Sequence, residues 1–385
     1  MNDAPVVVVG SGLAGYALAR EFRKLDKLTP LVVISRDHGG FYSKPMLSNA
    51  LAGQKTAASL LMKSADKMAV ELNATVRAGV SVQHVDTAGQ RITLAGGEVL
   101  AYRDLVLALG ADPIRPPLAG DGADAAMSVN DLDDYARFAQ ALDGARSVAI
   151  LGGGLIGCEF ANDLLHRGIQ PSVIDMAEWP LSRLLPREAG EWLRSRLEAA
   201  GVVFRLGCSV RSIERCDGGK TIALSDGSAL QADQVLSAVG LQPRLSLASA
   251  AGLATGRGIT TDRLLATSAA HVHAMGDCAE VLGLNLPYVL PLMQQSRALA
   301  STLCGQPTRL VYAAMPVLVK TPACPTVVCS PQPGAAGRWV VEAGDDACEA
   351  RFVNAEDQLL GFALLGAATA KKQALTALVP GCWAD

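Results

Sequence analysis

The stretch Val6-Val7-Val8-Val9-Gly10-Ser11-Gly12-Leu13-Ala14-Gly15 decides the fold class. Its β-branched run predicts a buried strand, a helix-compatible segment follows from residue 16 to about residue 25, and residues 31–34 predict a second strand. In such a G-x-G-x-x-G turn the first glycine permits the tight turn, and the second lets a pyrophosphate approach the backbone. The third lets helix and strand pack closely. The unit therefore predicts a dinucleotide-binding fold.

The same unit occurs a second time. The apolar run 148–151 precedes Gly152-Gly153-Gly154-Leu155-Ile156-Gly157, and residues 172–175 form the next expected strand. Both copies also close alike, because residues 104–113 and 233–243 each run from an aspartate through an apolar strand to G-x-x-P. A single glycine turn also serves packing, but two copies with the same closing motif favour two nucleotide sites. We expect two Rossmann-like domains, one inserted in the other.

Composition excludes several classes of protein. The 34 Lys and Arg against 37 Asp and Glu give a formal net charge of −3, and no basic stripe indicates a nucleic-acid partner. The nine cysteines are an odd number, and no two have C-x-x-C spacing. This argues against a secreted disulfide scaffold and favours the cytoplasm. The first residues lack the basic region of a signal peptide, and no apolar run is long enough for a membrane span.

A third motif follows the second unit. Residues 269–277 predict a strand that ends in Ala274-Met275-Gly276-Asp277. With the two glycine turns, this A-x-G-D motif resembles the FAD-dependent pyridine nucleotide-disulfide reductase superfamily over essentially the whole chain. The resemblance implies that the first fold holds FAD, that Asp277 hydrogen-bonds the ribityl chain and that the second fold holds the nicotinamide cofactor. We interpret His271 and His273 as ordinary strand residues, because no third metal ligand is evident, and we expect no metal.

The residues after the second strand of each unit differ. Asp175 ends that strand in the second unit, where a carboxylate bonds a ribose 2′-OH and repels a 2′-phosphate, so we predict NADH over NADPH. In the first unit the sequence continues Ser35-Arg36-Asp37, with the expected acid displaced. How the FAD adenosine ribose is held stays open at this point.

The segment from Tyr42 to Ser48 separates this chain from thiol-dependent relatives. NADH oxidases and peroxidases of similar build carry a catalytic cysteine here, and disulfide reductases carry C-x-x-C, but this chain has neither. The pattern Y-x-(R/K)-P-x-L-S resembles single-flavin ferredoxin and rubredoxin reductases. The resemblance implies that Lys44 lies near flavin N5 and pairs with Glu159. A surface lysine and an exposed glutamate are the alternative.

The last seventy residues change character. Four expected strands (326–330, 338–342, 349–353 and 359–364) and a helix over 369–378 predict a small α+β domain. Before them, Lys320-Thr321-Pro322 stands where ferredoxin-type reductases have aromatic residues. This resembles bacterial rubredoxin reductases of the alkane-hydroxylase type, which implies Lys320 at the flavin edge. The resemblance also aims the helix that begins near Pro291 at the flavin pyrimidine, where its dipole stabilises negative charge.

These patterns fix the expected domains and sites. We expect an FAD-binding domain (1–113 and 244–314), an NAD-binding domain (114–243) and a C-terminal domain (315–385). The candidate catalytic residues are Lys44, Glu159 and Lys320. The expected cofactor contacts around the first turn are Gly10, Ser11, Gly12, Leu13, Ala14, Gly15, Ser35, Arg36, Lys44, Pro45, Ala108, Gly110, Gly276, Asp277 and Val289. Around the second turn they are Gly152, Gly154, Leu155, Ile156, Gly157, Glu159, Asp175 and Gly240, with Lys320 completing the set.

The resemblance implies a function. A hydride passes from NADH to FAD N5, and two single electrons then pass to two rubredoxins, as in an alkane-hydroxylation system. Rubredoxins are acidic, so Lys44, Lys320, Arg115 and Arg297 are candidates for steering them to the flavin. The alternatives are a reductase for ferredoxin or flavorubredoxin, an NADH oxidase, and a redox-sensing flavoprotein in which turnover is incidental.

Overall fold

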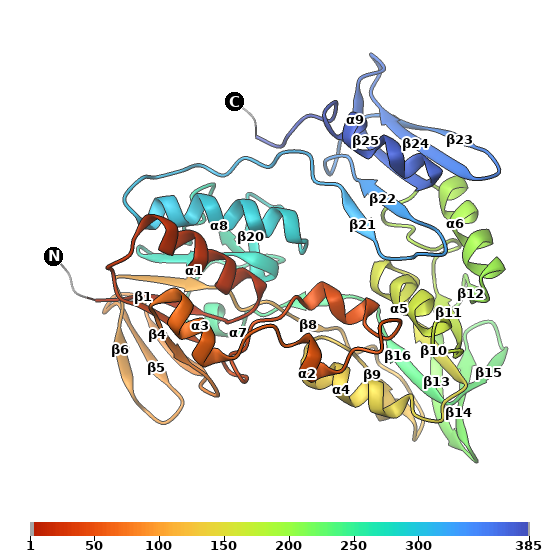
Figure 1. Cartoon of the computed structure of the whole chain (residues 1–385), viewed down its shortest axis with the longest axis horizontal. Coiled ribbons are helices and arrows are strands. Elements are labelled where there is room, and N and C mark those ends of the chain that lie inside the picture. Colours follow the sequence, from red (N-terminus) through yellow and green to blue (C-terminus); the bar gives the residue numbers. More distant parts are fainter. Residues whose placement is uncertain (1–3, 384–385) are drawn as a thin grey trace.

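The computed structural model describes residues 4–383, which form two nucleotide-type domains and a third, smaller sheet domain (Figure 1). The predicted fold class is confirmed. Strands β1 (Val6–Val9) and β2 (Leu31–Ile34) have the predicted bounds. Glycine-rich turns lead into α1 (Leu13–Leu25) and α5 (Leu155–Leu165), which both begin three residues earlier than the sequence indicates.

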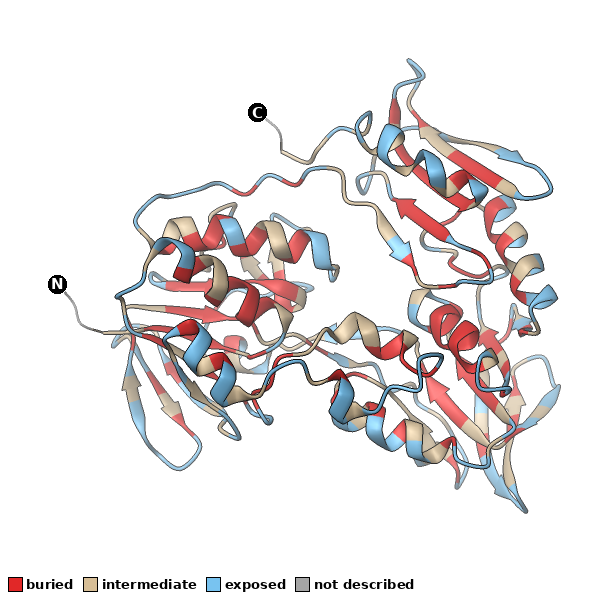
Figure 2. Cartoon of the chain, in the orientation of Figure 1, coloured by how far each residue is buried: buried red, intermediate tan, exposed pale blue. Residues whose placement is uncertain are grey.

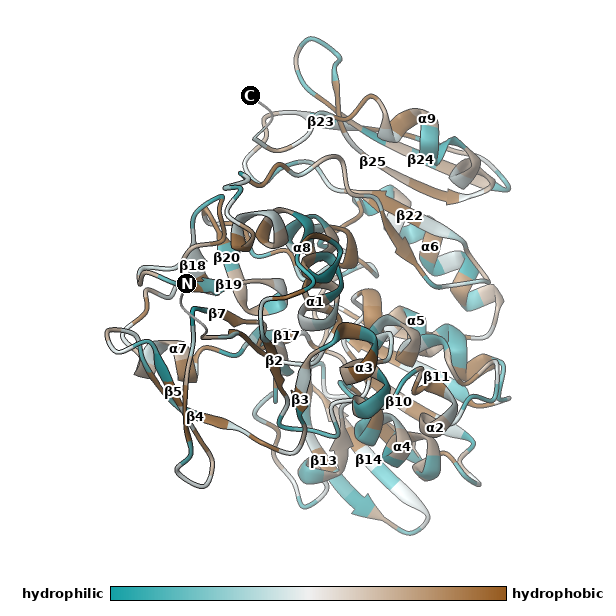
Figure 3. Cartoon of the chain, turned by 60° about the vertical axis from the view of Figure 1, so that its left-hand side comes forward, coloured by the Kyte–Doolittle hydropathy of each residue, from teal (hydrophilic) through white to brown (hydrophobic). Residues whose placement is uncertain are grey.

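The first domain is built on a parallel sheet of order β19-β7-β1-β2-β3. Its strands are nearly all buried, because helices α1 and α8 (Val289–Leu303) pack together on one face while an antiparallel sheet and a helix cover the other (Figures 1 and 2). Figure 3 shows the strongly hydrophobic strands of this sheet beside more polar helix surfaces. The remaining elements are α3 (Ala65–Leu72), β3 (Thr75–Arg77), β4 (Val82–Asp86), β5 (Arg91–Leu94), β6 (Val99–Ala101), β7 (Asp104–Leu107), α7 (Ser246–Ala250), β18 (Ile259–Thr261), β19 (Val272–Ala274) and β20 (Ala279–Val281).

The second domain repeats this plan. Its parallel sheet has the order β12-β11-β10-β16-β9, with an antiparallel sheet, β13-β14-β15, at its side. The elements are β9 (Ala126–Met127), α4 (Leu132–Ala141), β10 (Ser147–Leu151), β11 (Gln170–Asp175), α6 (Arg187–Ala199), β12 (Val203–Leu206), β13 (Val210–Cys216), β14 (Gly219–Leu224), β15 (Ala229–Ala232) and β16 (Gln234–Ser237).

The two closing motifs meet each other. Strands β8 (Ala111–Pro113) and β17 (Leu241–Pro243) pair in antiparallel fashion, so both chain crossings between the first two domains lie side by side. The proposed boundaries at residues 113/114 and 243/244 fall at the ends of this ribbon and stay a proposal.

The C-terminal domain is an antiparallel sheet of order β21-β22-β25-β24-β23. Its strands are β21 (Val317–Val319), β22 (Thr326–Cys329), β23 (Arg338–Ala343), β24 (Ala347–Val353) and β25 (Leu359–Gly366). The single helix expected over 369–378 is wrong: a 3-10 turn, η4 (Ala367–Lys371), precedes a short α9 (Lys372–Thr376). This sheet packs against α6 of the second domain (Figure 1), where Trp192 Nε1 donates to Gly344 O at 3.0 Å.

Four short elements complete the described residues: η1 (Lys44–Asn49), α2 (Ala57–Leu60), η2 (Ala123–Ala125) and η3 (Gly276–Cys278). The strand expected over residues 269–277 is shorter in the structure: β19 ends at Ala274, and the chain turns into η3 at Gly276, which has a left-handed φ of 75°. Within residues 4–383 the structure has no helix with the length and apolarity for a membrane span.

Candidate functional site

The carboxyl ends of the first parallel sheet gather the expected flavin-side residues. The register pairs Val9 with both Ile34 and Leu107, and Leu107 with Ala274, so the residues that follow these four strands lie along one edge. Ligands of open parallel sheets bind at such an edge. The sheet therefore brings together the glycine turn, Ser35, Ala108 and the turn with Asp277.

The three glycines of the first turn have different surroundings. A Cβ on Gly10 would lie 2.1 Å from Ala108 O, and one on Gly15 would lie 1.9 Å from Gly10 O, so both positions exclude any side chain. A Cβ on Gly12 would meet no atom within 4 Å. The middle glycine thus leaves free space next to the backbone at the start of α1, which is the space a pyrophosphate needs.

The second turn has the same geometry. A Cβ on Gly152 would lie 2.6 Å from Ala238 O and one on Gly157 would lie 1.9 Å from Gly152 O, whereas Gly154 again faces open space. At the carboxyl end of β16 the hydroxyl of buried Ser237 has no hydrogen-bond partner among the described residues. Leu155 and Ile156 form the first turn of α5, and Gly240 has a φ of 124° just before β17. These features fit a second dinucleotide.

The residues expected to hold a nucleotide ribose differ between the turns. Asp175 Oδ2 accepts the Gly153 N–H at 2.5 Å, and its Oδ1 accepts the Ala177 N–H at 2.8 Å. In the first turn, Ser35 Oγ lies 2.6 Å from Ser11 Oγ and donates to Asp37 Oδ1 at 2.5 Å. The displaced acid is therefore Asp37, which the hydroxyl groups of Ser11 and Ser35 connect to the first glycine turn.

Hydrogen bonds also set the charge of Asp37. Burial by itself raises the pKa of this carboxyl, but donors on Ser35 and Gly39 outweigh burial and hold the pKa below its ordinary value. The carboxylate is thus kept charged beside the first glycine turn. Arg36, the candidate next to it, points to solvent and lies 3.5 Å from Asp112, so it takes part in a surface ion pair.

The expected pair of Lys44 and Glu159 is wrong. Glu159 is fully buried and its carboxylate contacts Lys320: the Lys320 backbone N–H donates to Oε1 at 2.9 Å, and its ammonium group contacts Oε2. Ser48 Oγ donates to the same Oε2 at 2.5 Å. The ion pair therefore links the C-terminal domain to α5, with Ser48 of η1 as a third member.

Lys44 instead stands apart from any carboxylate. The described residues give it no ion pair within 4.0 Å, and desolvation lowers the pKa of its amine, opposed chiefly by the charge of Asp277. Lys44 is the first residue of η1, and Pro45 follows it. A lysine ammonium without an ion-pair partner among the described residues is suited to a negatively charged ligand group.

Helix α8 and the turn before it complete the flavin side. Gly276 N–H donates to Gln295 Oε1 at 2.8 Å, and Gln295 Nε2 donates to Tyr312 O–H at 2.7 Å, which fixes η3 against α8. Gln294 Oε1 is buried with no partner among the described residues, and Val289 is 40% exposed at the start of the helix. The open glycine turn, the unpaired Lys44 and this orphaned amide oxygen fit an FAD.

Sequence reasoning missed several residues that the structure brings to the site. Gln295 and Tyr312 fix η3, and Arg244 binds Asp112 at 2.5 Å and donates to Leu109 O at 2.7 Å behind Gly110. Ser48 lies inside the Tyr42–Ser48 motif, so the sequence contained a signal for it. Asn162 and Asp163 lie on α5 with no motif of their own.

The cysteines take no part in this arrangement. All nine are free thiols. Cys278, next to Asp277, is fully buried, and burial raises the pKa of its thiol to about 11. Cys158, in the second glycine turn, is also buried with a raised pKa and lies 3.4 Å from Gly153 O. Both stay protonated and behave as packing residues.

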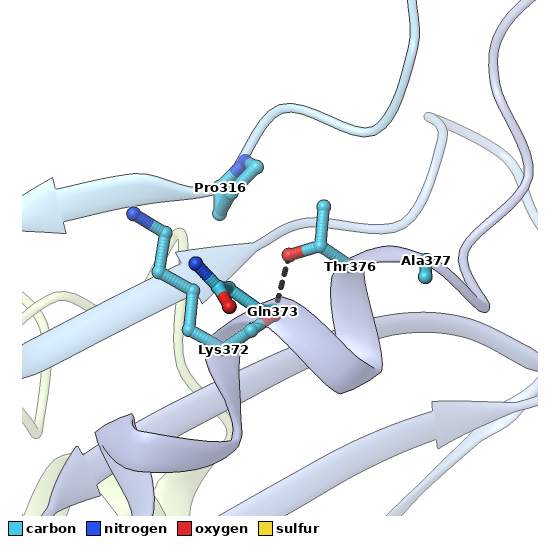
Figure 4. A pocket seen from close by; sticks show the side chains of 5 residues that line it. All are labelled: Pro316, Lys372, Gln373, Thr376 and Ala377. Carbon is cyan, nitrogen blue, oxygen red and sulfur yellow. Dashed lines mark hydrogen bonds between the residues drawn. The ribbon is translucent and has the colours of Figure 1, made fainter.

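Two further features take no part in the glycine turns. His271 Nδ1 is 3.2 Å from Asp104 Oδ1, and buried His273 has an unpaired Nδ1. No cluster of three or more metal-ligating side chains occurs among residues 4–383. A shallow hollow on the C-terminal domain is lined by residues of α9 and by Pro316, with the Lys372 side chain at its edge (Figure 4).

Family models and relatives match nearly the whole chain. The pyridine nucleotide-disulphide oxidoreductase model matches residues 4–302, and a model for a rubredoxin binding C-terminal domain matches residues 309–379. The chain is 50% identical to a rubredoxin-NAD(+) reductase of Alcanivorax borkumensis over 98% of both chains. It is 45% identical to the protein of the same name from Acinetobacter baylyi, again over 98% of both.

Solved structures agree on the architecture. A ferredoxin reductase from Rhodopseudomonas palustris superposes with a TM-score of 0.89 at 24% identity, over 98% of this chain and 96% of that chain. The putidaredoxin reductase in its covalent complex with putidaredoxin gives 0.88 at 26% identity, over 98% and 94%. The full-length matches and the two glycine turns lead to one conclusion: the chain belongs to the pyridine nucleotide-disulphide oxidoreductase family.

Proposed function

We propose that the chain is an FAD-dependent NADH:rubredoxin oxidoreductase, which transfers one electron pair from NADH to two oxidised rubredoxins and releases NAD⁺ and a proton. The observation that carries the proposal is the junction of Ser48, Glu159 and Lys320. It joins the flavin-side segment, the nicotinamide-side helix and the domain that matches a rubredoxin-binding model. Donor, cofactor and acceptor regions thus meet at one buried carboxylate.

Each residue has a role in this proposal. FAD, when bound, supplies the chemistry that accepts a hydride and returns electrons singly. Gly10, Gly12 and Gly15 would shape its pyrophosphate turn, Asp277 would hold the ribityl chain, and the α8 N-terminus with Val289 would lie toward the pyrimidine. Lys44 and Lys320 supply positive charge near the ring, and Glu159 offsets the burial of Lys320.

The nicotinamide side selects the donor. The turn around Gly154 receives the NADH pyrophosphate, and Asp175 orients the adenosine ribose while its charge disfavours a 2′-phosphate. Because none of the nine cysteines pairs and burial raises the thiol pKa values of Cys158 and Cys278, no thiol relay is needed. Nine free thiols also suit a reducing compartment, so we infer a cytoplasmic protein.

The experiment is anaerobic bleaching of rubredoxin by NADH, with a [2Fe–2S] ferredoxin at equal concentration in parallel. Fast bleaching of rubredoxin alone supports the proposal. If neither carrier bleaches while NADH reduces the flavin, the proposal is wrong. Raising the salt concentration should slow rubredoxin reduction and leave flavin reduction by NADH nearly unchanged, because only carrier docking depends on charge steering.

A second candidate rests on other relatives. The chain is 36% identical, over 95% of both chains, to a nitric oxide reductase FlRd-NAD(+) reductase of Vibrio vulnificus. A flavorubredoxin is therefore the alternative acceptor. Its rubredoxin-like domain should be reduced faster than free rubredoxin if this candidate is right.

A further inference from the structure

Helix α5 carries three buried polar side chains on one face. Glu159, Asn162 and Asp163 are 0%, 2% and 1% exposed. Their spacing of three and four residues places them above one another on the helix. Buried polar groups require hydrogen-bond partners, so a face of this kind must bind other parts of the molecule.

All three bind segments that lie outside the nicotinamide-side domain. Asn162 Oδ1 accepts the Ala323 N–H at 3.0 Å, three residues after Lys320. Asp163 accepts the Leu51 N–H at 2.8 Å and the Ala52 N–H at 2.9 Å, just after η1. One segment carries Lys320 and the other carries Lys44, the two lysines assigned to the flavin.

The Lys320 turn joins β21 to β22, and the antiparallel pairing of these strands, which ends at Val319 and Thr326, sets its place within the C-terminal sheet. Its internal bonds join Thr321 and Cys324: the Cys324 N–H donates to Thr321 O at 2.8 Å and Thr321 Oγ1 donates to Cys324 O at 2.7 Å. These bonds shape the turn but do not attach it to the nicotinamide-side domain. Its bonds to α5 are those of Glu159 at one end and Asn162 at the other. Two contacts with different residues of α5 determine the position and the orientation of the turn relative to that helix.

We propose that Asn162 and Asp163 are positioning residues, which hold the Lys320 turn and the Lys44 segment against the nicotinamide-binding helix. The inference rests on the proposed function, in which both lysines face the flavin. Because α5 begins at the second glycine turn, one rigid helix then fixes the nicotinamide cofactor and both flavin-side cations together. Neither residue touches the reacting groups.

The test is the midpoint potential of bound FAD in the holoenzyme, measured without any carrier. Asn162 is neutral, so Asn162→Ser changes no charge but leaves the Ala323 N–H without its acceptor. A displaced Lys320 stabilises the reduced flavin less, so the potential should fall in the same direction as in Lys320→Met. In a Lys320→Met background, Asn162→Ser should produce no further fall.

Trp192→Phe is the matched control. It removes the hydrogen bond to Gly344 O, which also joins the C-terminal domain to the nicotinamide-side domain, but at a distance from Lys320 along the chain. We expect the potential of this variant to stay at the wild-type value. A fall in Trp192→Phe equal to that in Asn162→Ser would overturn the proposal, because general loosening of the domain would then explain both.

A second pair of variants tests whether Asp163 positions the Lys44 segment. Asp163→Asn removes a charge as well as an acceptor, so its effect must be compared with and without Lys44→Met. Different shifts in the two backgrounds support coupling to Lys44, and equal shifts contradict it. If both cycles show coupling but wild-type protein does not bleach rubredoxin, the acceptor assignment fails and the positioning roles stand. If the enzyme does bleach rubredoxin but the shifts in midpoint potential are equal with and without the lysine substitutions, the positioning roles are wrong and the proposed function stands.

Discussion

The two glycine turns exclude side chains at the same positions, but they differ in how a nearby carboxylate is hydrogen-bonded to each turn. In both turns, a Cβ added to the third glycine would lie 1.9 Å from a backbone oxygen, and a Cβ added to the middle glycine would meet no atom within 4 Å. In the second turn Asp175 bonds the backbone directly, whereas in the first Ser11 and Ser35 stand between the turn and Asp37. The shared part serves the pyrophosphate, and the variable part serves the ribose.

The largest effect should come from the shared part. Gly15→Ala forces a Cβ against Gly10 O, and the cost should approach the total stability of a domain, about 5–15 kcal/mol. We expect loss of soluble flavoprotein. Gly157→Ala puts the same clash into the other domain, so the protein that stays soluble should keep FAD bound but lose its reduction by NADH, while dithionite still reduces the flavin. Anaerobic absorbance spectra measure both outcomes.

Gly53→Ala is the control for these variants, because an added Cβ there makes only ordinary contacts, at 3.5 Å or more. It should retain wild-type spectra. Normal reduction of the Gly157→Ala variant by NADH would contradict the comparison, since the second turn would then tolerate a side chain at its third glycine.

The next effect comes from the variable part. Asp175→Ser gives the second turn the residue that the first has at Ser35. Loss of charged hydrogen bonds worth about 1.5–3 kcal/mol should raise the KM for NADH roughly tenfold to a hundredfold. The preference for NADH over NADPH should shrink, because the negative charge is gone. Steady-state kinetics with both nucleotides measure this, and FAD content should not change; an unchanged nucleotide preference would contradict the role of Asp175.

A smaller effect concerns the cation that only the flavin side carries. Burial lowers the pKa of Lys44 from its ordinary value, so its charge is lost at a lower pH than in an exposed lysine. The rate of flavin reduction by NADH should therefore decline on the alkaline side below the usual lysine range. Lys44→Arg should remove this decline, because arginine stays charged. The same decline in both proteins would assign it to another group.

The smallest effect is a pH dependence of stability that comes from one edge strand of the first parallel sheet and has no counterpart in the second. His273 lies in β19, beside β7, whereas the corresponding edge strand β9 has no titratable residue. Burial lowers the pKa of His273, so the unfolded chain binds a proton near its ordinary pKa of about 6.5 that the folded chain rejects. Stability should fall as pH drops through this value.

His273→Phe should flatten that dependence, because it removes both the titration and an unpaired buried nitrogen. Urea unfolding at pH 7.5 and 5.5 measures the difference. An equally steep loss of stability in the variant would place the acid-sensitive group elsewhere.

Local chemistry explains what the sequence revealed. A glycine turn is required where a Cβ would strike the backbone, and that property belongs to residues close together in the chain, such as Gly10 and Gly15. The strand runs before each turn are equally local, since continuous apolar runs and β-branching predict them without distant partners. The sequence by itself therefore determined both nucleotide folds, the A-x-G-D turn and the absence of a thiol at residues 41–48.

Only the tertiary structure decided how distant charges pair. Nothing in the chain distinguishes Lys44 from Lys320 as the partner of Glu159, because 161 residues separate Glu159 from Lys320 and no periodicity links them. The choice depends on where α5 meets the C-terminal sheet, which is set by packing of whole domains. The same holds for Asn162 and Asp163, whose partners are backbone N–H groups that any sequence could supply. The physical reason is that each polar group buried at that junction must have a hydrogen-bond partner, and the folded structure decides which groups lie within reach.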